Sequence, residues 1–247
     1  MIEEYNVIDY EGGGVMKITY WSDYACPYCY IGEVRLKKAI ANVPELGEVE
    51  LEMKAFQLDP DAGEHATGDT QTRFAKKYGL TIDHAGRSVE HIAQMGRAEG
   101  LDFNYAETQF TNTMDAHRLT KLAQSKGDPA LAQRVVDALF HAYFGENKEL
   151  ADKALLQEIG VSCGLDANEV TDLLDSDQYR DEVIVDEREA ARYGIHAVPF
   201  FVIGQQGLSG AYPVEAMEQV LRETLKSLPQ DPPAQGMQCG PDGCRLG

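Results

Sequence analysis

The sequence predicts an α/β protein in which a long all-helical segment interrupts a small sheet. Two strand-like segments near the start of the chain flank one helical segment, and a series of helical segments follows. Two short strand-like segments and a last helix then close the core, ahead of a tail rich in Pro and Gly. We therefore expect a sheet assembled from both ends of the chain, with the helices inserted between its strands.

The composition limits the class of protein. The chain has 247 residues, 41 acidic against 22 basic side chains and a formal net charge of −19. Nucleic-acid binding depends on Lys and Arg that neutralise phosphates, so this charge argues against a nucleic-acid partner. No apolar run reaches the roughly 18–20 residues that cross a bilayer, and we expect no membrane partner. Residues 1–15 lack the pattern of a signal peptide and read as a loose leader, with Met16 as a candidate start, so we expect a cytoplasmic protein.

The first predicted elements are a strand, a helix and a second strand. Met16–Ser22 combines β-branched and aromatic side chains over the length of a strand. Pro27 suits the first turn of a helix, and a helical apolar pattern follows it as far as Pro44. Residues 49–58 alternate and predict the second strand, before a polar loop at 59–70. This opening is a β-α-β unit.

Helical patterns dominate the middle of the chain. The cleanest lies at 128–144, where Leu131, Val135 and Leu139 share one face and Asp128 is the predicted N-cap. The other predicted helices are 72–78, 88–99, 112–126, 152–159, 167–174 and 177–193.

The chain then returns to strands. The apolar run Phe200–Ile203 and the shorter segment 208–210 predict a hairpin, and Pro213 opens a last helix. A β-α-β unit joined to a hairpin and a final helix is the thioredoxin arrangement, here with a large all-helical insertion. We expect a discontinuous thioredoxin domain, a helical insertion domain and a flexible C-terminal tail. Their predicted ranges are 16–61 with 175–227, 62–174, and 228–247.

Cys26 and Cys29 are the predicted catalytic pair. They open a predicted helix, where unpaired N–H groups and the helix dipole favour a thiolate on the first cysteine. A second cysteine three positions later can reach back and close a disulfide. We therefore interpret Cys26 as the nucleophile and Cys29 as the resolving thiol. The alternative is half of a zinc site, but no His clusters near the pair. Asp23 is a candidate for moving protons to a buried Cys29.

Pro199 is the third predicted catalytic residue. It stands before a strand and after a helix, a place that suits a cis X–Pro bond; an ordinary proline at a strand start would carry no such meaning. His196, three positions earlier, is a candidate for tuning Cys26. Cys163 reads as an inert, buried thiol at a helix end.

Cys239 and Cys244 form a second pair, in the tail. The Gly-Pro-Asp-Gly between them is turn chemistry. A tight turn brings two thiols near the ~5.5–6 Å Cα separation of a disulfide, and the segment before Cys239 spans roughly 35–40 Å when extended. We hypothesise a relay in which this pair exchanges disulfides with Cys26 and Cys29; the alternative is a passive clip.

Four segments together carry a resemblance to a known family. They are SDYACPYCYIG, NTMDAHRL, GIHAVPFFVIG and GLSGAYP, in this order over about residues 16–226. The chain resembles the DsbA-like oxidoreductases of the thioredoxin superfamily, in their cytosolic FrnE-type branch. The resemblance implies a cis-proline loop at Val198-Pro199 beside the active cysteines, with the Val198 backbone pairing with an extended substrate. FrnE-type proteins include members with a C-x4-C pair, which the tail resembles.

The resemblance also indicates substrate contacts. Related 2-hydroxychromene-2-carboxylate isomerases carry Ser in place of Cys26 and bind glutathione there, so Cys26 argues for redox chemistry. Tyr28 replaces the His of exported DsbA, which favours a milder oxidant or an isomerase of disulfides. The helix at 112–126 is expected over the active site, although an N-cap is the ordinary role for Asn112 and a satisfied helix residue for His117. The substrate-binding candidates are Tyr24, Tyr28, Asn112, His117 and Val198.

The sequence therefore favours a thiol–disulfide oxidoreductase or disulfide isomerase. Its expected partners are protein thiols and disulfides or glutathione as a co-substrate, with no cofactor or metal beyond its own disulfides. A glutathione-dependent isomerase or transferase acting on a small aromatic or polyketide-type substrate is the second interpretation. A non-catalytic, chaperone-like binding module is the third. The sequence does not give an oligomeric state.

Overall fold

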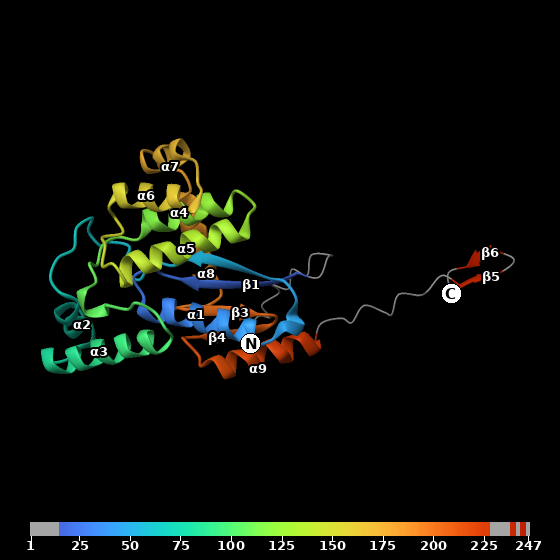
Figure 1. Cartoon of the computed structure of the whole chain (residues 1–247). Helices are drawn as coiled ribbons and strands as arrows, with labels where there is room; N and C mark the ends of the chain where they lie inside the picture. Colours follow the sequence, from blue (N-terminus) through green and yellow to red (C-terminus); the bar gives the residue numbers. More distant parts are fainter. Residues whose placement is uncertain (1–14, 228–237, 241–242, 246–247) are drawn as a thin grey trace.

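The computed structural model describes residues 15–227, 238–240 and 243–245. Its main sheet has four strands in the order β2-β1-β3-β4. Strand β1 (Met16–Ser22) pairs parallel with β2 (Val49–Ala55) and antiparallel with β3 (Phe200–Ile203), which pairs in turn with β4 (Gln206–Ser209). The sheet is thus built from both ends of the sequence, as predicted (Figure 1).

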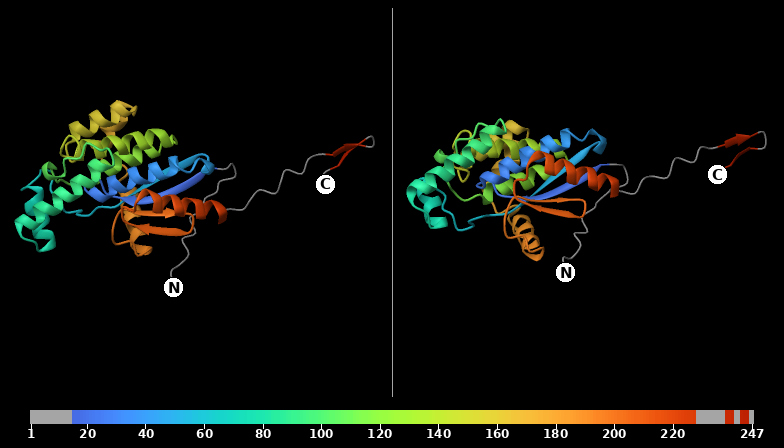
Figure 2. Two further views of the ribbon diagram at one scale, coloured as in Figure 1. Left: turned by 60° about the horizontal axis from the view of Figure 1, so that its bottom comes forward. Right: turned by 90° about the horizontal axis from the view of Figure 1, so that it is seen from below.

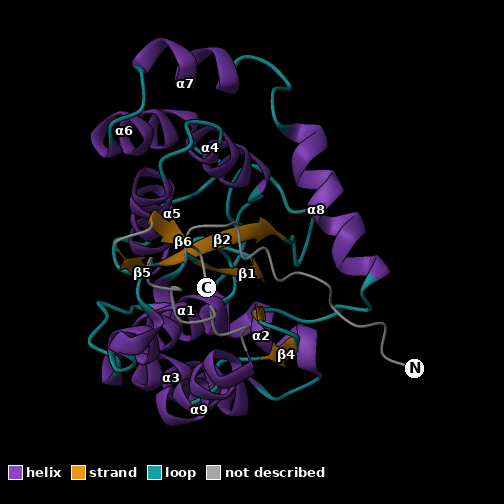
Figure 3. Cartoon of the chain, turned by 90° about the vertical axis from the view of Figure 1, so that its right-hand side faces the viewer, coloured by secondary structure: helices purple, strands orange, loops and turns teal. Residues whose placement is uncertain are grey.

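The two faces of the sheet have separate cores. Ile18 and Tyr20 of β1 belong to the large core that includes α1 (Pro27–Ala41) and α9 (Val214–Ser227). The next side chain, Trp21, packs with residues of α8 (Arg180–Arg192) and β3. Figure 3 shows α1 and α9 on one side of the strands and α8 on the other. This alternation is what a strand buried on both faces requires.

The inserted helices form two groups. Helices α2 and α3 lie at one end of the molecule, while α4 to α7 stack beside β2 (Figures 1 and 2). The bounds of these helices are Thr70–Tyr78 (α2), Ile82–Ala98 (α3), Met114–Gln124 (α4), Pro129–Phe144 (α5), Lys153–Cys163 (α6) and Ala167–Leu174 (α7), with short 3-10 turns at Pro44–Leu46 and Tyr105–Glu107. Asp128 caps α5 as predicted, because its carboxylate accepts the N–H groups of Ala130 and Leu131.

Several predicted bounds were wrong. Helix α3 begins six residues earlier than expected, because the Thr81 hydroxyl caps it by accepting the His84 N–H. Strand β2 ends at Ala55 and not at residue 58, because the Leu58 N–H donates to the Asp23 carboxylate and not to a strand carbonyl. Strand β4 begins at Gln206, because the hairpin turn is short and uses Gly204 at φ +61°.

The tail contributes a second, two-stranded sheet. Strands β5 (Gln238–Gly240) and β6 (Gly243–Arg245) pair antiparallel. The rest of the predicted flexible tail lies outside the described residues. The predicted domain ranges stay predictions.

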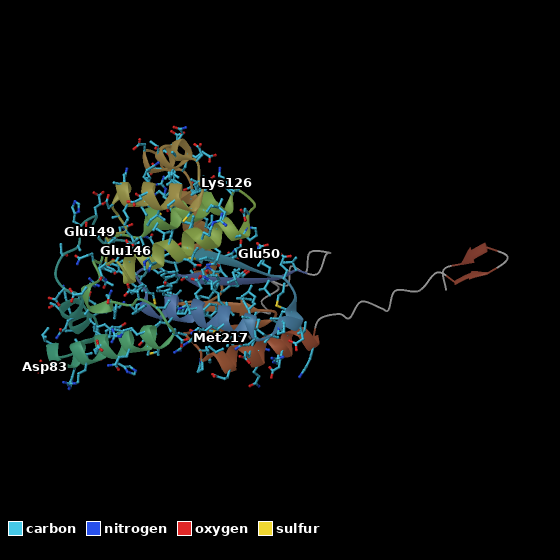
Figure 4. All side chains as sticks on the ribbon, in the orientation of Figure 1. Glu50, Asp83, Lys126, Glu146, Glu149 and Met217 are labelled. Atoms are coloured by element: carbon cyan, nitrogen blue, oxygen red, sulfur yellow. The ribbon has the colours of Figure 1, made fainter. Side chains whose placement is uncertain are left out.

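Close packing joins helix α1 to the segment before β3. A Cβ atom on Gly32 would lie 3.0 Å from Cγ of Pro199 and 3.2 Å from Cζ of Phe201. Glycine therefore allows the helix that starts at the cysteine pair to approach Pro199. On the other side of α1, Met217, labelled in Figure 4, lies on the face of α9 that is turned toward α1, and it is fully buried.

This packing predicts that Gly32→Ala lowers the free energy of unfolding by about 1–3 kcal/mol, because the added methyl overfills a tight contact. Gly86→Ala in α3 is the matched control. There the added Cβ meets only the end of the flexible Gln71 side chain, and Ala is favoured over Gly in a helix by up to ~1 kcal/mol. Urea unfolding of both variants measures the difference, and equal stability would contradict the close contact.

Candidate active site

The cysteine pair lies where β1 gives way to α1. After Ser22 the chain turns, and the Cys26 N–H donates to the Asp23 carbonyl at 3.0 Å. Cys26 is the N-cap residue of α1 with extended backbone, and Pro27 occupies the first helical position. Helix N-termini favour negative charge, so this position suits a reactive sulfur.

The two sulfurs have different surroundings. Cys26 is 4% exposed and Cys29 is 0% exposed, and both are free thiols. The Cys26 thiol lies 3.5 Å from the Val198 carbonyl oxygen, while the Cys29 sulfur accepts the main-chain N–H of Asp23 at 3.5 Å. Burial raises the pKa of the Cys29 thiol well above its ordinary value, and the neighbouring Cys26 adds to the shift. Cys26 therefore reaches the surface and Cys29 lies sealed beneath it.

The Val198-Pro199 peptide bond is cis. Pro199 is buried, and its carbonyl accepts the Gly210 N–H at 2.8 Å. The loop thus places the Val198 carbonyl beside Cys26.

Asp23 anchors the turn from beneath. Its buried carboxylate accepts the N–H groups of Leu58 at 2.7 Å and Ala25 at 3.3 Å. His117 Nε2 lies 3.5 Å from Asp23 Oδ1. The contact between Asp23 and Cys29 is made by the Asp23 main chain and not by its carboxylate.

A hollow of about 550 Å³ opens over Cys26. Of the sequence-predicted residues, Tyr28, Val198 and His196 line it together with Cys26. Tyr28 is 39% exposed, and burial, followed by the nearby Tyr78 and Cys26, raises the pKa of its phenol. The candidate site therefore combines the predicted nucleophile, the proline loop and an aromatic wall.

Three of the predicted substrate contacts do not line this hollow. Tyr24 is fully buried and shares a hydrogen bond with the Thr120 hydroxyl. The His117 ring is also buried, 4.9 Å from the Tyr24 ring, so it supports the turn from inside. Asn112 donates to the Pro60 carbonyl and accepts the Met114 N–H, each at 2.8 Å. These side chains hold the site in place without lining its hollow.

Cys163 is another correction. It lies half-buried at the end of α6, near the surface, where its thiol contacts the Arg134 carbonyl at 3.5 Å. Its apolar sequence neighbours suggested a core position, but the helix ends there against exposed residues.

Sequence reasoning missed the wall that the insertion supplies. Helix α2 and the segment after α3 bring basic and aromatic side chains into the hollow over Cys26. These are Arg73, Phe74, Lys76, Lys77, Tyr78, Tyr105 and Phe110. A run of basic residues in a chain of net charge −19 is the signal that points to them.

The tail pair lies on facing strands. In the β5–β6 hairpin, Cys239 is the direct partner of Cys244. Over the part of the chain with described side chains, no group of three or more His, Cys, Asp or Glu is placed to hold a metal ion. Over the same part, no helix has the length and apolar character of a membrane span.

A thioredoxin sheet with a helical insertion and a cysteine pair opening α1 defines a DsbA-like oxidoreductase domain. The family model described as "DSBA-like thioredoxin domain" matches residues 17–222, and the chain belongs to this family.

Three individual proteins are similar to this chain in sequence or fold. The crystal structure of the probable DsbA oxidoreductase SCO1869 from Streptomyces coelicolor is 35% identical, covers 94% of this chain and 99% of its own, and superposes with a TM-score of 0.80. The uncharacterized protein YwbO of Bacillus subtilis is 24% identical over 85% of this chain and 97% of its own. Cytosolic disulfide reductase DsbM from Pseudomonas aeruginosa, solved with GSH, shares the fold at 18% identity and a TM-score of 0.56, over 85% of this chain and 100% of its own.

The raised pKa of Cys29 predicts a pH dependence of stability. The unfolded chain loses the Cys29 proton near pH ~8.5, while the folded protein keeps it to higher pH. The stabilisation is therefore complete below the unfolded pKa and is lost as pH rises toward the folded pKa. We expect the free energy of unfolding of the reduced protein to fall above the unfolded pKa, by an amount on the order of 1 kcal/mol per pH unit.

Denaturant unfolding under reducing conditions between about pH 8 and 10 measures this loss. Cys29→Ser, which has no thiol to titrate there, is the control and should lose less. Identical pH profiles for the two proteins would contradict the assigned pKa direction.

Proposed function

We propose that this protein catalyses thiol–disulfide exchange with protein substrates, as an oxidoreductase or a disulfide isomerase. The observation that carries the proposal is the asymmetry of the pair: Cys26 lies at the mouth of the hollow beside Val198, and Cys29 lies buried behind it. Cys26 is placed to form a disulfide with a substrate, and Cys29 is placed to attack that disulfide and release the substrate.

The exchange uses only the two thiols. The Cys26 thiolate attacks one sulfur of a substrate disulfide, so that a Cys26–substrate disulfide forms and the other substrate sulfur leaves as a thiolate. Cys29, after losing its proton, attacks the Cys26 sulfur and expels the remaining substrate thiolate. The enzyme ends oxidised and the substrate reduced; the reverse sequence oxidises a dithiol substrate.

The proline loop positions the partner. An extended segment that carries the reacting sulfur pairs with the Val198 backbone, beside Cys26. Tyr28 covers the other side of the segment, because it lines the same hollow and is partly exposed.

Glutathione is the proposed small partner that resets the pair, in a cytoplasmic setting. The relative DsbM is described as a cytosolic disulfide reductase and was solved with GSH. Glutathione-dependent isomerisation of a small substrate is not favoured, because Cys29 would have no part in it.

The tail is proposed to act as a relay. The hairpin register sets Cys239 opposite Cys244, and directly opposed residues in an antiparallel pair have Cα atoms ~4.5–5.5 Å apart, which suits a disulfide. The tail pair passes its disulfide to Cys26 and Cys29 and is itself reduced to two thiols.

Cys26→Ser is expected to abolish catalysis of insulin reduction by dithiothreitol and of refolding of scrambled ribonuclease, because the attacking sulfur is gone. Cys29→Ser should instead accumulate mixed disulfides with substrate, visible on non-reducing gels. Cys163→Ser is the control and should match wild type. Full activity of Cys29→Ser toward glutathione and a small aromatic substrate, with no disulfide exchange by wild type, would favour the isomerase interpretation instead.

The relay predicts that replacing both Cys239 and Cys244 with Ser slows multiple turnover several-fold and leaves the first turnover of the pre-reduced protein unchanged. In the relay, only the step that restores the Cys26–Cys29 pair after each turnover depends on the tail pair. Stopped-flow and steady-state assays separate the two rates. Unchanged steady-state turnover would leave the tail as a passive clip.

A further inference from the structure

We propose that the groove beside Cys26 selects polypeptide substrates whose reacting cysteine is flanked by acidic residues. The groove consists of the hollow over Cys26 and a second hollow along α3. The two share Tyr28, Phe74 and Ile92 in their walls. This inference rests on the proposed thiol–disulfide exchange and specifies its substrates.

Helix α2 presents three cations to the groove. Arg73, Lys76 and Lys77 all line the hollow that contains Cys26. Within the described chain none of them pairs with a carboxylate. The Arg73 guanidinium lies 4.1 Å above the Phe110 ring, and its buried Nη1 has no hydrogen-bond partner.

The missing carboxylates are not due to a shortage of acids. The chain has 41 acidic residues, and several cations elsewhere pair with them. Arg35 pairs with Glu99 at 2.6 Å, Lys121 with Asp186 at 2.5 Å, and Lys54 with Glu189. Basic side chains left unpaired beside the reacting sulfur in so acidic a chain indicate a site for external negative charge.

The second hollow continues the same chemistry. His84, Arg87 and His91, from α3, line its wall together with apolar side chains. Asp59 is the one acid among the described residues that line either hollow.

The walls between the cations are apolar and open. Tyr28, Tyr78 and Leu80 are 39%, 57% and 37% exposed. A groove that combines exposed aromatic surface with unpaired cations fits an extended peptide with acidic and apolar side chains. The negative field of the rest of the surface then keeps acidic segments away from other places and concentrates them here.

The test uses symmetric disulfide-linked dimers of one short peptide, made in three versions with Glu, Gln or Lys on both sides of the cysteine. Attack by Cys26 on either sulfur gives the same products, so the versions differ only in flanking charge. The rate of oxidation of the reduced, full-length protein is followed by acid quench and mass spectrometry. Each series is repeated at low and high salt, and with glutathione disulfide.

Wild type should react about fivefold faster with the Glu version than with the Gln version, and slowest with the Lys version. A fivefold ratio is about what two or three screened ion pairs give. Salt should reduce the preference. Lys76→Glu with Lys77→Glu should abolish or invert the preference, measured as the ratio of the rate with the Glu version to the rate with the Gln version. Arg180→Glu with Lys226→Glu, at exposed sites on α8 and α9, makes the same charge change and should match wild type.

Equal rates with all three peptides would overturn the selectivity and leave thiol–disulfide exchange intact. No reaction with any peptide would instead remove the proposed function. A preference that survives Lys76→Glu with Lys77→Glu, or a change in these variants confined to glutathione disulfide, would show that the groove is not the peptide site.

Discussion

Antiparallel pairing of β1 with β3 is the constraint on which the candidate site depends. Because Trp21 lies opposite Phe200, the C-terminal end of β1 and the N-terminal end of β3 lie side by side at the same end of the sheet. The residues just beyond that end, Cys26 and Val198, therefore meet although they lie 172 positions apart in the sequence. Gly32 then lets α1 approach Pro199 closely enough for the helix N-terminus and the proline loop to form one surface.

The helical insertion contributes residues to this site from two sides. From the inner side of the insertion, His117 of α4 packs against Tyr24 of the turn that carries Cys26, so the turn rests on a buried support. From its outer side, α2 supplies the cations and aromatic rings that wall the hollow. The thioredoxin part thus supplies the two sulfurs, and the insertion supplies one wall of the hollow over Cys26.

Local patterns predicted most of the fold. Strand β1, helix α7 and strand β3 have the predicted bounds, and Asp128 caps α5 through its carboxylate, because these features depend on neighbours in sequence. The sequence also indicated the cysteine pair and the proline loop, which stand at element boundaries. It did not distinguish Tyr28, which faces the hollow, from Tyr24, which is buried, because only tertiary packing decides which side of the turn each ring takes. The basic wall from α2 was missed for the same reason: its run of basic residues is visible in the sequence, but only tertiary packing brings it next to Cys26.

The most direct measurement identifies which sulfur first takes up a substrate. Reduced wild-type protein is mixed with a limiting amount of glutathione disulfide. Samples are quenched in acid at successive times within the first turnover and digested for peptide mapping. We predict that the early glutathione adduct lies on Cys26, is absent from Cys29 and Cys163, and decays as the Cys26–Cys29 disulfide forms. An early adduct on Cys29, or one on Cys163 that forms as fast as that on Cys26, would contradict the assignment of Cys26, which lines the hollow, as nucleophile and of Cys29 as resolving thiol.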